Sequence, residues 1–202
     1  PDGSLLLYWT RRSGGASVGG AAYVVPTAGG EPRPIHSDIQ LNVPPIWSPD
    51  GRAVLLLGAR AGVLDCWIAP LDGGAPRPTG FLQWVQRHNI RASLEAPGFS
   101  VWTGDRLLFT AGHGDANNLW ETTLHAGTGQ FGEPRRLTSG STVDTQPAVA
   151  GSRIAYASLM VNTDVWSVPL DANQGKVTGE LRRLTSSVDV DAHATRPLSG
   201  SK

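Results

Sequence analysis

The sequence predicts an all-β fold built from short antiparallel strands, and three observations favour it. Gly (25) and Pro (15) together make up about a fifth of the 202 residues, which is too many turn-formers for a helical bundle. Short apolar segments recur along the chain at nearly constant intervals. No segment of ten or more residues carries apolar side chains at the i, i+3, i+4 spacing that a solenoid of paired helices needs.

Each repeat contains an apolar strand that is entered through a turn. These strands are expected at residues 4–9, 52–57, 106–110 and 153–157, and their starts lie 48, 54 and 47 residues apart. The turns before them are Pro1-Asp2-Gly3, Ser48-Pro49-Asp50-Gly51, Thr103-Gly104-Asp105 and Ala150-Gly151-Ser152. Because the strands are almost continuously apolar, we expect neighbouring strands to cover both of their faces.

Two further segments follow in the same order in every repeat. Strands centred on an aromatic residue are expected at 22–26, 66–70, 119–123 and 165–169, with Tyr23, Trp67, Trp120 and Trp166 at equivalent positions. Segments containing Pro-Arg or Arg-Arg-Leu-Thr follow at 31–34, 75–78, 133–138 and 180–185. Pro and Arg on this outer strand would discourage pairing with another sheet edge.

A fourth strand per repeat comes just before the turn, at 45–47, 101–102, 147–149 and 197–198. Four short strands with a period near 40–50 residues are typical of a β-propeller blade. We therefore predict one β-propeller segment over residues 1–202, with about four four-stranded antiparallel blades. The repeats are approximately 1–47, 48–102, 103–149 and 150–202.

The residues of these repeats resemble a known family. Ser48-Pro49-Asp50-Gly51-Arg52, followed by an apolar strand and the stretch 68–74, resembles the TolB-like (WD40-like) β-propeller repeat. The stretch 162–185 resembles propeller regions of bacterial serine/threonine protein kinases and winged-helix regulators. The resemblance implies a non-catalytic binding or sensory scaffold within a larger bacterial protein, linked to an effector domain outside this segment. It slightly favours a periplasmic or other extracytoplasmic location over the cytoplasm.

Ring closure and function both leave alternatives open. A strand near 197–198 would close a four-bladed ring, whereas the abrupt chain ends favour an open arc of a six- to eight-bladed propeller. One alternative function is the substrate-gating propeller of a prolyl oligopeptidase-like serine peptidase whose hydrolase domain lies elsewhere. Another is a freestanding periplasmic TolB-like interaction protein. The pentapeptide Gly15-Ala16-Ser17-Val18-Gly19 has no helix after it, so no catalytic residue is expected.

Charge and cysteine content exclude several classes of partner. Lys+Arg and Asp+Glu both number 17, so the chain has no basic excess for nucleic acid. The single cysteine, Cys66, excludes an intramolecular disulfide and a structural zinc site. No apolar run approaches the roughly 18–20 residues that cross a bilayer. We expect a protein or peptide partner, or a small polar ligand, and neither a cofactor nor a metal.

The loops that lead from one repeat into the next carry the candidate ligand-binding residues. These are His36, Asp38, His88, Asp144, Asp191 and His193. In a propeller such loops converge at one mouth of the central channel, where carboxylates and imidazoles can bind a small polar ligand. The alternative is that they are solvated turn residues.

An insertion at residues 81–96 of the second repeat carries the candidate interaction residues Trp84, Arg87 and Arg91. Trp84 matches no repeat position, and Trp and Arg are enriched at binding hot spots. Trp84 is therefore a candidate for an exposed recognition residue, and the alternative is an insertion that buries its own tryptophan.

Overall fold

The computed structural model describes residues 2–11, 19–41, 43–92, 98–113, 116–160 and 164–186. The chain separates into two compact units, Pro1–Leu159 (unit 1) and Met160–Lys202 (unit 2). Within the described ranges, no helix is long and apolar enough to cross a membrane. The fold is all-β, as the sequence predicts, and its strand pairs are antiparallel except for one parallel bridge; the propeller arrangement and the total number of blades stay predictions.

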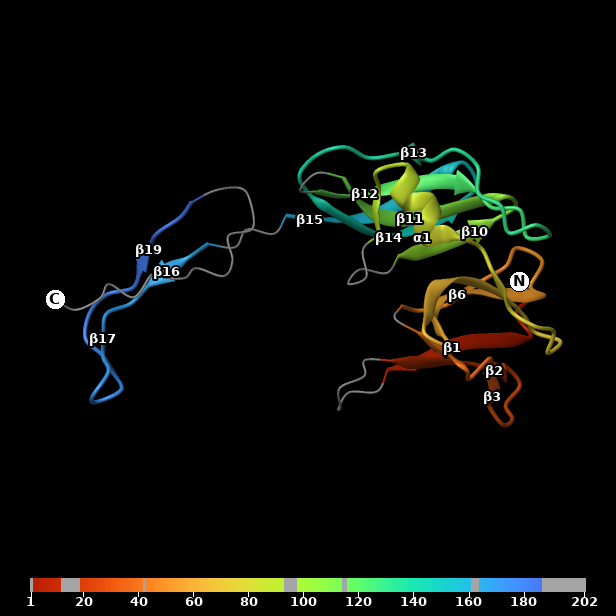
Figure 1. The fold of residues 1–202 in the computed structure, drawn as a ribbon, viewed down its shortest axis with the longest axis horizontal. Coiled ribbons are helices and arrows are strands. Elements are labelled where there is room, and N and C mark those ends of the chain that lie inside the picture. The colour runs from red at the N-terminus through yellow and green to blue at the C-terminus, as the bar shows by residue number, and fades with distance from the viewer. Residues whose placement is uncertain are drawn as a thin grey trace. The chain divides into compact units, whose positions relative to one another are not determined.

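The first sheet of unit 1 holds the first two repeats (Figure 1). Its main path runs β1-β2-β4-β6-β7-β8, with β3 paired to β2 and β5 paired to β6. The strands are β1 (Leu5–Arg11), β2 (Gly20–Pro26), β3 (Arg33–Ile35), β4 (Ile39–Leu41), β5 (Ile46–Trp47), β6 (Ala53–Arg60), β7 (Val63–Pro70) and β8 (Arg77–Pro78).

The second sheet of unit 1 holds the last strands of the second repeat, the third repeat and the start of the fourth (Figure 1). Its path runs β10-β11-β12-β14-β15, with β13 paired to β12 and β9 paired to β11. The strands are β9 (Arg91–Ala92), β10 (Phe99–Thr103), β11 (Arg106–His113), β12 (Ala116–Thr123), β13 (Arg135–Arg136), β14 (Val143–Ala150) and β15 (Arg153–Leu159). Helix α1 (Phe81–Arg87) lies between the two sheets in the chain.

The repeat predicted from the sequence appears as a repeated strand register. The aromatic of the third strand pairs with the fourth strand at Tyr23↔Pro34, Trp67↔Pro78, Trp120↔Arg136 and Trp166↔Arg183. The residue after the aromatic pairs in the same way, at Val24↔Arg33, Ile68↔Arg77, Glu121↔Arg135 and Ser167↔Arg182. The alignment of third and fourth segments is therefore confirmed in all four repeats.

The Ser-Pro-Asp-Gly turn of the second repeat is held by its own side chains. The Ser48 hydroxyl donates to Asp50 Oδ1 (2.6 Å) and accepts from the Ala53 amide (2.9 Å). Gly51 has φ 71°, a value that a residue without Cβ adopts at no steric cost. The turn thus starts β6 with its polar groups satisfied.

Strands β6 and β7 bury both of their faces, as their apolar sequence predicts. One face, with Leu55, Leu57 and Ile68, packs in a core cluster against Phe99 and Phe109 of the second sheet. The opposite face, with Val54, Leu56, Trp67 and Ala69, packs against β2, β3 and β4. Cys66 lies in the first of these clusters and is fully buried.

Two of the repeated tryptophans tie the third strand to the second strand of the same blade. The indole N–H of Trp67 donates to the Gly58 carbonyl (3.0 Å), and that of Trp120 donates to the Ala111 carbonyl (3.2 Å). A buried indole needs such an acceptor, because an unpaired N–H away from water is costly.

Arginines on the outer strands connect successive blades. Arg33 of β3 donates to the Leu71 carbonyl (3.0 Å), in the turn after β7. Arg77 of β8, its equivalent, donates to the carbonyls of Ala126 (2.8 Å) and Gly127 (2.7 Å), in the turn after β12. These arginines therefore do more than place charge on an edge strand: each binds the backbone of the next repeat.

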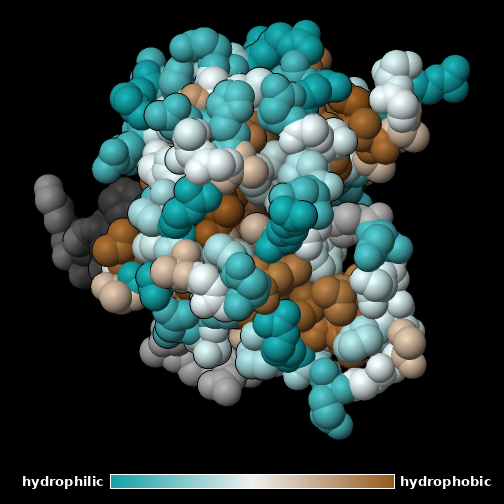
Figure 2. Space-filling view, turned by 90° about the vertical axis from the view of Figure 1, so that its right-hand side faces the viewer, coloured by the Kyte–Doolittle hydropathy of each residue, from teal (hydrophilic) through white to brown (hydrophobic). Residues whose placement is uncertain are grey.

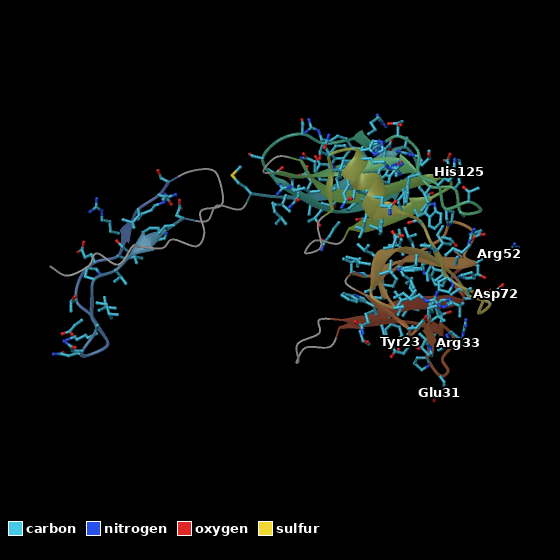
Figure 3. All side chains as sticks on the ribbon, viewed as in Figure 1. Tyr23, Glu31, Arg33, Arg52, Asp72 and His125 are labelled. Atoms are coloured by element: carbon cyan, nitrogen blue, oxygen red, sulfur yellow. The ribbon has the colours of Figure 1, made fainter. Side chains whose placement is uncertain are left out.

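The turns that follow β7 and β12 lie on one side of unit 1, called here the turn side, together with polar side chains from successive repeats. Figure 3 shows Arg33, Arg52, Asp72 and His125 along one side of the unit. The space-filling view of that side shows mostly hydrophilic residues, with smaller hydrophobic patches between them (Figure 2).

Unit 2 contains the later strands of the fourth repeat. β16 (Trp166–Ser167) pairs with β19 (Arg182–Arg183), and β17 (Leu170–Asp171) forms a hairpin with β18 (Lys176–Val177). An ion pair joins Arg183 to Asp164 (2.6 Å). The two halves of the fourth repeat are thus described in separate units, and the single domain over 1–202 stays a prediction.

Candidate binding site beside helix α1

The insertion forms a helix that the repeat pattern did not predict. Helix α1 has no side-chain cap at Gly80, which has φ 70°. The Asp65 carboxylate of β7 instead accepts the amides of Gly80 (2.9 Å) and Phe81 (3.0 Å). A carboxylate stabilises the free amides at a helix N-terminus. Asp65 thereby fixes the start of α1 against the second blade.

Aromatic side chains fix the other face of α1 against the third blade. Phe81 stacks on Trp84 with ring centroids 5.9 Å apart, and Trp84 contacts Phe131 at 5.1 Å. The Trp84 indole donates to the Gly132 carbonyl (3.0 Å). Trp84 is only 5% exposed. The interpretation of Trp84 as an exposed recognition residue is therefore wrong, and the alternative holds: the insertion packs its own tryptophan.

A pocket of about 510 Å³ opens at the C-terminal end of α1. It is lined by Trp84, Arg87, His88, Phe131, Gly132 and Glu133. Pockets that bind small ligands usually measure about 300–1,000 Å³ and combine an apolar lining with a few polar groups. This pocket is lined by two aromatic and three ionisable side chains, and it includes two of the residues that the sequence singled out, Arg87 and His88.

His88 is oriented by contacts on both ring nitrogens. Nδ1 lies 2.8 Å from the Trp84 carbonyl, and Nε2 lies 3.5 Å from Glu133 Oε2. Because a carbonyl only accepts, the contact with Trp84 is a hydrogen bond donated by Nδ1–H, and Nε2 faces Glu133. Glu133 is 93% exposed at the side chain, so its carboxylate stands at the rim of the pocket.

Arg87 is exposed in the last turn of α1, and Arg91 is exposed on β9, which pairs with β11. Among the described residues, no hydrogen bond or ion pair holds the Arg87 guanidinium. The structure thus brings the insertion residues Trp84, Arg87 and His88 to one site, where Trp84 is almost fully buried.

His36 and Asp38 lie away from this pocket, before β4. His36 Nε2 lies 3.3 Å from the Pro70 carbonyl. Asp38 accepts from Arg60 Nε (2.5 Å), and this hydrogen bond is the main reason that the pKa of Asp38 is lowered. The same guanidinium lies 5.8 Å from the centre of the Trp67 ring. Asp38 therefore helps to hold Arg60 over a core tryptophan.

Asp144 lies within the sheet and does not line an open mouth. It is buried in β14 and accepts the hydroxyls of Thr142 (3.0 Å) and Ser158 (2.7 Å). Burial alone would raise the pKa of Asp144, but hydrogen bonds led by the one from Ser158 lower it. Asp191 and His193 lie outside the described residues. Among those described, no three His, Cys, Asp or Glu side chains gather as a metal site would require.

Phe131, Gly132 and Glu133 complete the pocket, and the sequence analysis did not select them as site residues. Glu133 opens the fourth segment of its repeat, Glu133-Pro134-Arg135-Arg136, where it matches Glu31 and Glu180. A position that recurs in three repeats indicates the start of a strand, so nothing in the sequence selected Glu133 as a binding residue. Its approach to His88 depends on where the insertion helix packs, which the repeat period does not specify.

Comparison with known proteins relates more than half of the chain to TolB proteins. This chain is 30% identical over 119 residues to the "Tol-Pal system protein TolB" of Anaeromyxobacter dehalogenans (strain 2CP-C), and equally to that of Anaeromyxobacter sp. (strain K). The match covers 59% of this chain and 24% of each relative, so the chain spans about a quarter of their length. The TolB-like part of the resemblance is supported, and the kinase and winged-helix part stays a prediction.

No protein family in the comparison matches the chain. Among solved structures, it is similar to the β-propeller domain of the Trilobed protease from Pyrococcus furiosus, whose title describes an open velcro topology. The two share 13% identity with a TM-score of 0.42, over 84% of this chain and 58% of that one.

Proposed function

We propose that this chain is a non-catalytic propeller module that binds a protein or peptide partner. The observation that carries the proposal is the 30% identity to TolB over 119 residues. The pocket beside α1 supports it, because an outward-facing pocket on a rigid scaffold is the usual place for recognition. Within the proposal, the module belongs to a larger bacterial protein and acts outside the cytoplasm, as the resemblance to periplasmic TolB propellers implies.

A displayed library of random peptides, selected on the whole chain, tests the proposal. We expect enriched peptides whose binding is lost in the variant Arg87→Gln/Glu133→Gln. The matched control Arg52→Gln/Asp72→Asn likewise replaces one arginine and one carboxylate with amides, on the turn side of unit 1, and it should keep the binding. If no peptide is enriched over the control selection without protein, the chain is not a peptide-binding module.

The proposed location has its own test. Cells of the source bacterium are separated into periplasmic and cytoplasmic fractions, and an antibody to the chain locates the protein that carries it. Recovery in the cytoplasmic fraction alone would contradict the extracytoplasmic assignment and leave the binding proposal standing.

A further inference from the structure

We propose that the pocket beside α1 binds the C-terminal residue of a peptide. Its carboxylate binds Arg87, and its apolar side chain lies against Phe131 and the small part of Trp84 that the fold leaves exposed. This inference rests on the proposed binding function and names the chemistry that the site would recognise.

Arg87 is suited to bind an anion from outside the chain. The carbonyls at the C-terminal end of α1 are already used: those of Trp84, Val85 and Gln86 accept the amides of His88, Ile90 and Asn89 and the His88 ring. Arg87 is therefore not needed to cap them, although a basic residue in this position often does so. A guanidinium presents paired donors that match the two oxygens of a carboxylate.

The base of the pocket suits a flat or branched apolar group. The rings of Trp84 and Phe131 lie 5.1 Å apart and both pack on Phe81. The hydrogen bond from the Trp84 indole to Gly132 fixes that ring before any ligand arrives. A surface that is already rigid loses less entropy on binding.

Glu133 and the size of the pocket narrow the choice of ligand. The exposed carboxylate of Glu133 would repel any acidic group that comes near it, so the one carboxylate of the ligand must bind at Arg87, and a second acidic group on its side chain is disfavoured. About 510 Å³ accommodates one terminal residue with its peptide group, and it is too small for a long segment. A single carboxylate on an apolar residue satisfies all of these conditions.

The test uses the whole chain and three small probes. They are N-acetylphenylalanine as the free acid, N-acetylphenylalanine amide, and N-acetylglutamic acid α-amide, which carries its carboxylate on the side chain. The measurement is the shift of the Trp84 indole N–H resonance, assigned with Trp84→Phe. We expect saturable binding of the free acid at about millimolar concentration, at least about tenfold tighter than either of the other probes.

Two variants connect that preference to Arg87. In Arg87→Gln the ratio of acid to amide affinity should fall to about one, while Arg52→Gln, which changes an exposed arginine elsewhere, should leave it unchanged. Equal binding of acid and amide, no binding of the acid up to about 20 mM, or a preference that survives in Arg87→Gln overturns the inference. If 3-phenylpropionate binds as tightly as the free acid, the pocket takes free small carboxylates and the peptide assignment is wrong.

Failure here is distinguishable from failure of the proposed function. Enriched library peptides that compete with one another, and that show no dependence on a free C-terminus, would leave the binding module standing and remove only the carboxylate assignment. An absence of enriched peptides would remove both.

Discussion

The third and fourth repeats contain the same paired segments in different surroundings. In both, the residue before the tryptophan makes the same two backbone contacts: the amides of Leu119 and Val165 each donate to a threonine hydroxyl (3.0 Å), and their carbonyls accept a leucine amide (2.8 Å). Yet Trp120 is 8% exposed, whereas Trp166 is 51% exposed. Pairing of the third and fourth strands is thus encoded in the segment itself, and within unit 1 the burial of Trp120 comes with strand β11, which pairs with β12.

The largest expected effect comes from replacing each of the two tryptophans with alanine. Trp120→Ala removes a buried ring and leaves the Ala111 carbonyl without its donor, so we expect a loss of about 3–5 kcal/mol in the free energy of unfolding. Trp166→Ala should cost no more than about 1 kcal/mol, because Trp166 is 51% exposed. Urea denaturation followed by circular dichroism measures both. Equal costs would show that the two tryptophans have equivalent surroundings.

The carboxylate two residues before Trp67 provides the next test, because repeat 3 has Asn118 at the equivalent position. Asp65→Asn places the asparagine of repeat 3 at the equivalent position of repeat 2, which carries α1. An amide has one acceptor oxygen where the carboxylate has two for Cys66, Gly80 and Phe81, so we expect a loss of about 1–3 kcal/mol. The quenching of Trp84 fluorescence by acrylamide should rise with it. Unchanged quenching and stability would mean that packing alone fixes the helix.

A smaller effect is expected from the arginines that join successive blades. Arg77→Ala removes two hydrogen bonds to the turn after β12, and exposure to water limits their net value to about 1 kcal/mol. Arg52→Ala is the matched control, because Arg52 is exposed in a turn and its side chain has no hydrogen bond or ion pair among the described residues. It should change stability by less than about 0.5 kcal/mol. A loss no greater than that of the control would contradict the role in joining blades.

The smallest effect depends on pH and concerns Glu121 of the third repeat, where the fourth repeat has Ser167. Burial would raise the pKa of Glu121, but hydrogen bonds and charge from Arg106 and Arg135 outweigh it and lower the pKa. A lowered pKa in the folded state stabilises the fold above the ordinary pKa near 4.5, and this stabilisation is lost as the pH falls through the lowered value.

Glu121→Gln should therefore reduce stability modestly at pH 7 and flatten its decline below about pH 4.5. Thermal unfolding at pH 3, 5 and 7 measures the change. A decline in the variant as steep as in the native chain would assign the acid sensitivity to other carboxylates, of which Asp144 is the next candidate.

Repetition made most of this fold predictable from sequence. The apolar second strands and the aromatic third strands lie where the period places them, because each copy supports the alignment of the others. The insertion at 81–96 has no second copy, and α1 is too short to show a helical period, so neither the helix nor the burial of Trp84 could be read from it. Asp144 was expected in a loop at the mouth of the channel, but it lies in β14 and its hydroxyl partner Ser158 comes from the neighbouring strand. Such strand partners are not visible in a sequence.

The one thiol of the molecule has a practical consequence. Cys66 is buried in the core between the second and third blades, where burial first and the adjacent Asp65 charge second raise the pKa of its thiol well above the ordinary value. A neutral, enclosed thiol does not react with an alkylating reagent, since the thiolate is the nucleophile. Alkylation of the native chain must therefore wait until the two blades part. The rate of Cys66 alkylation therefore measures how often the two blades separate, with no label added and no residue changed.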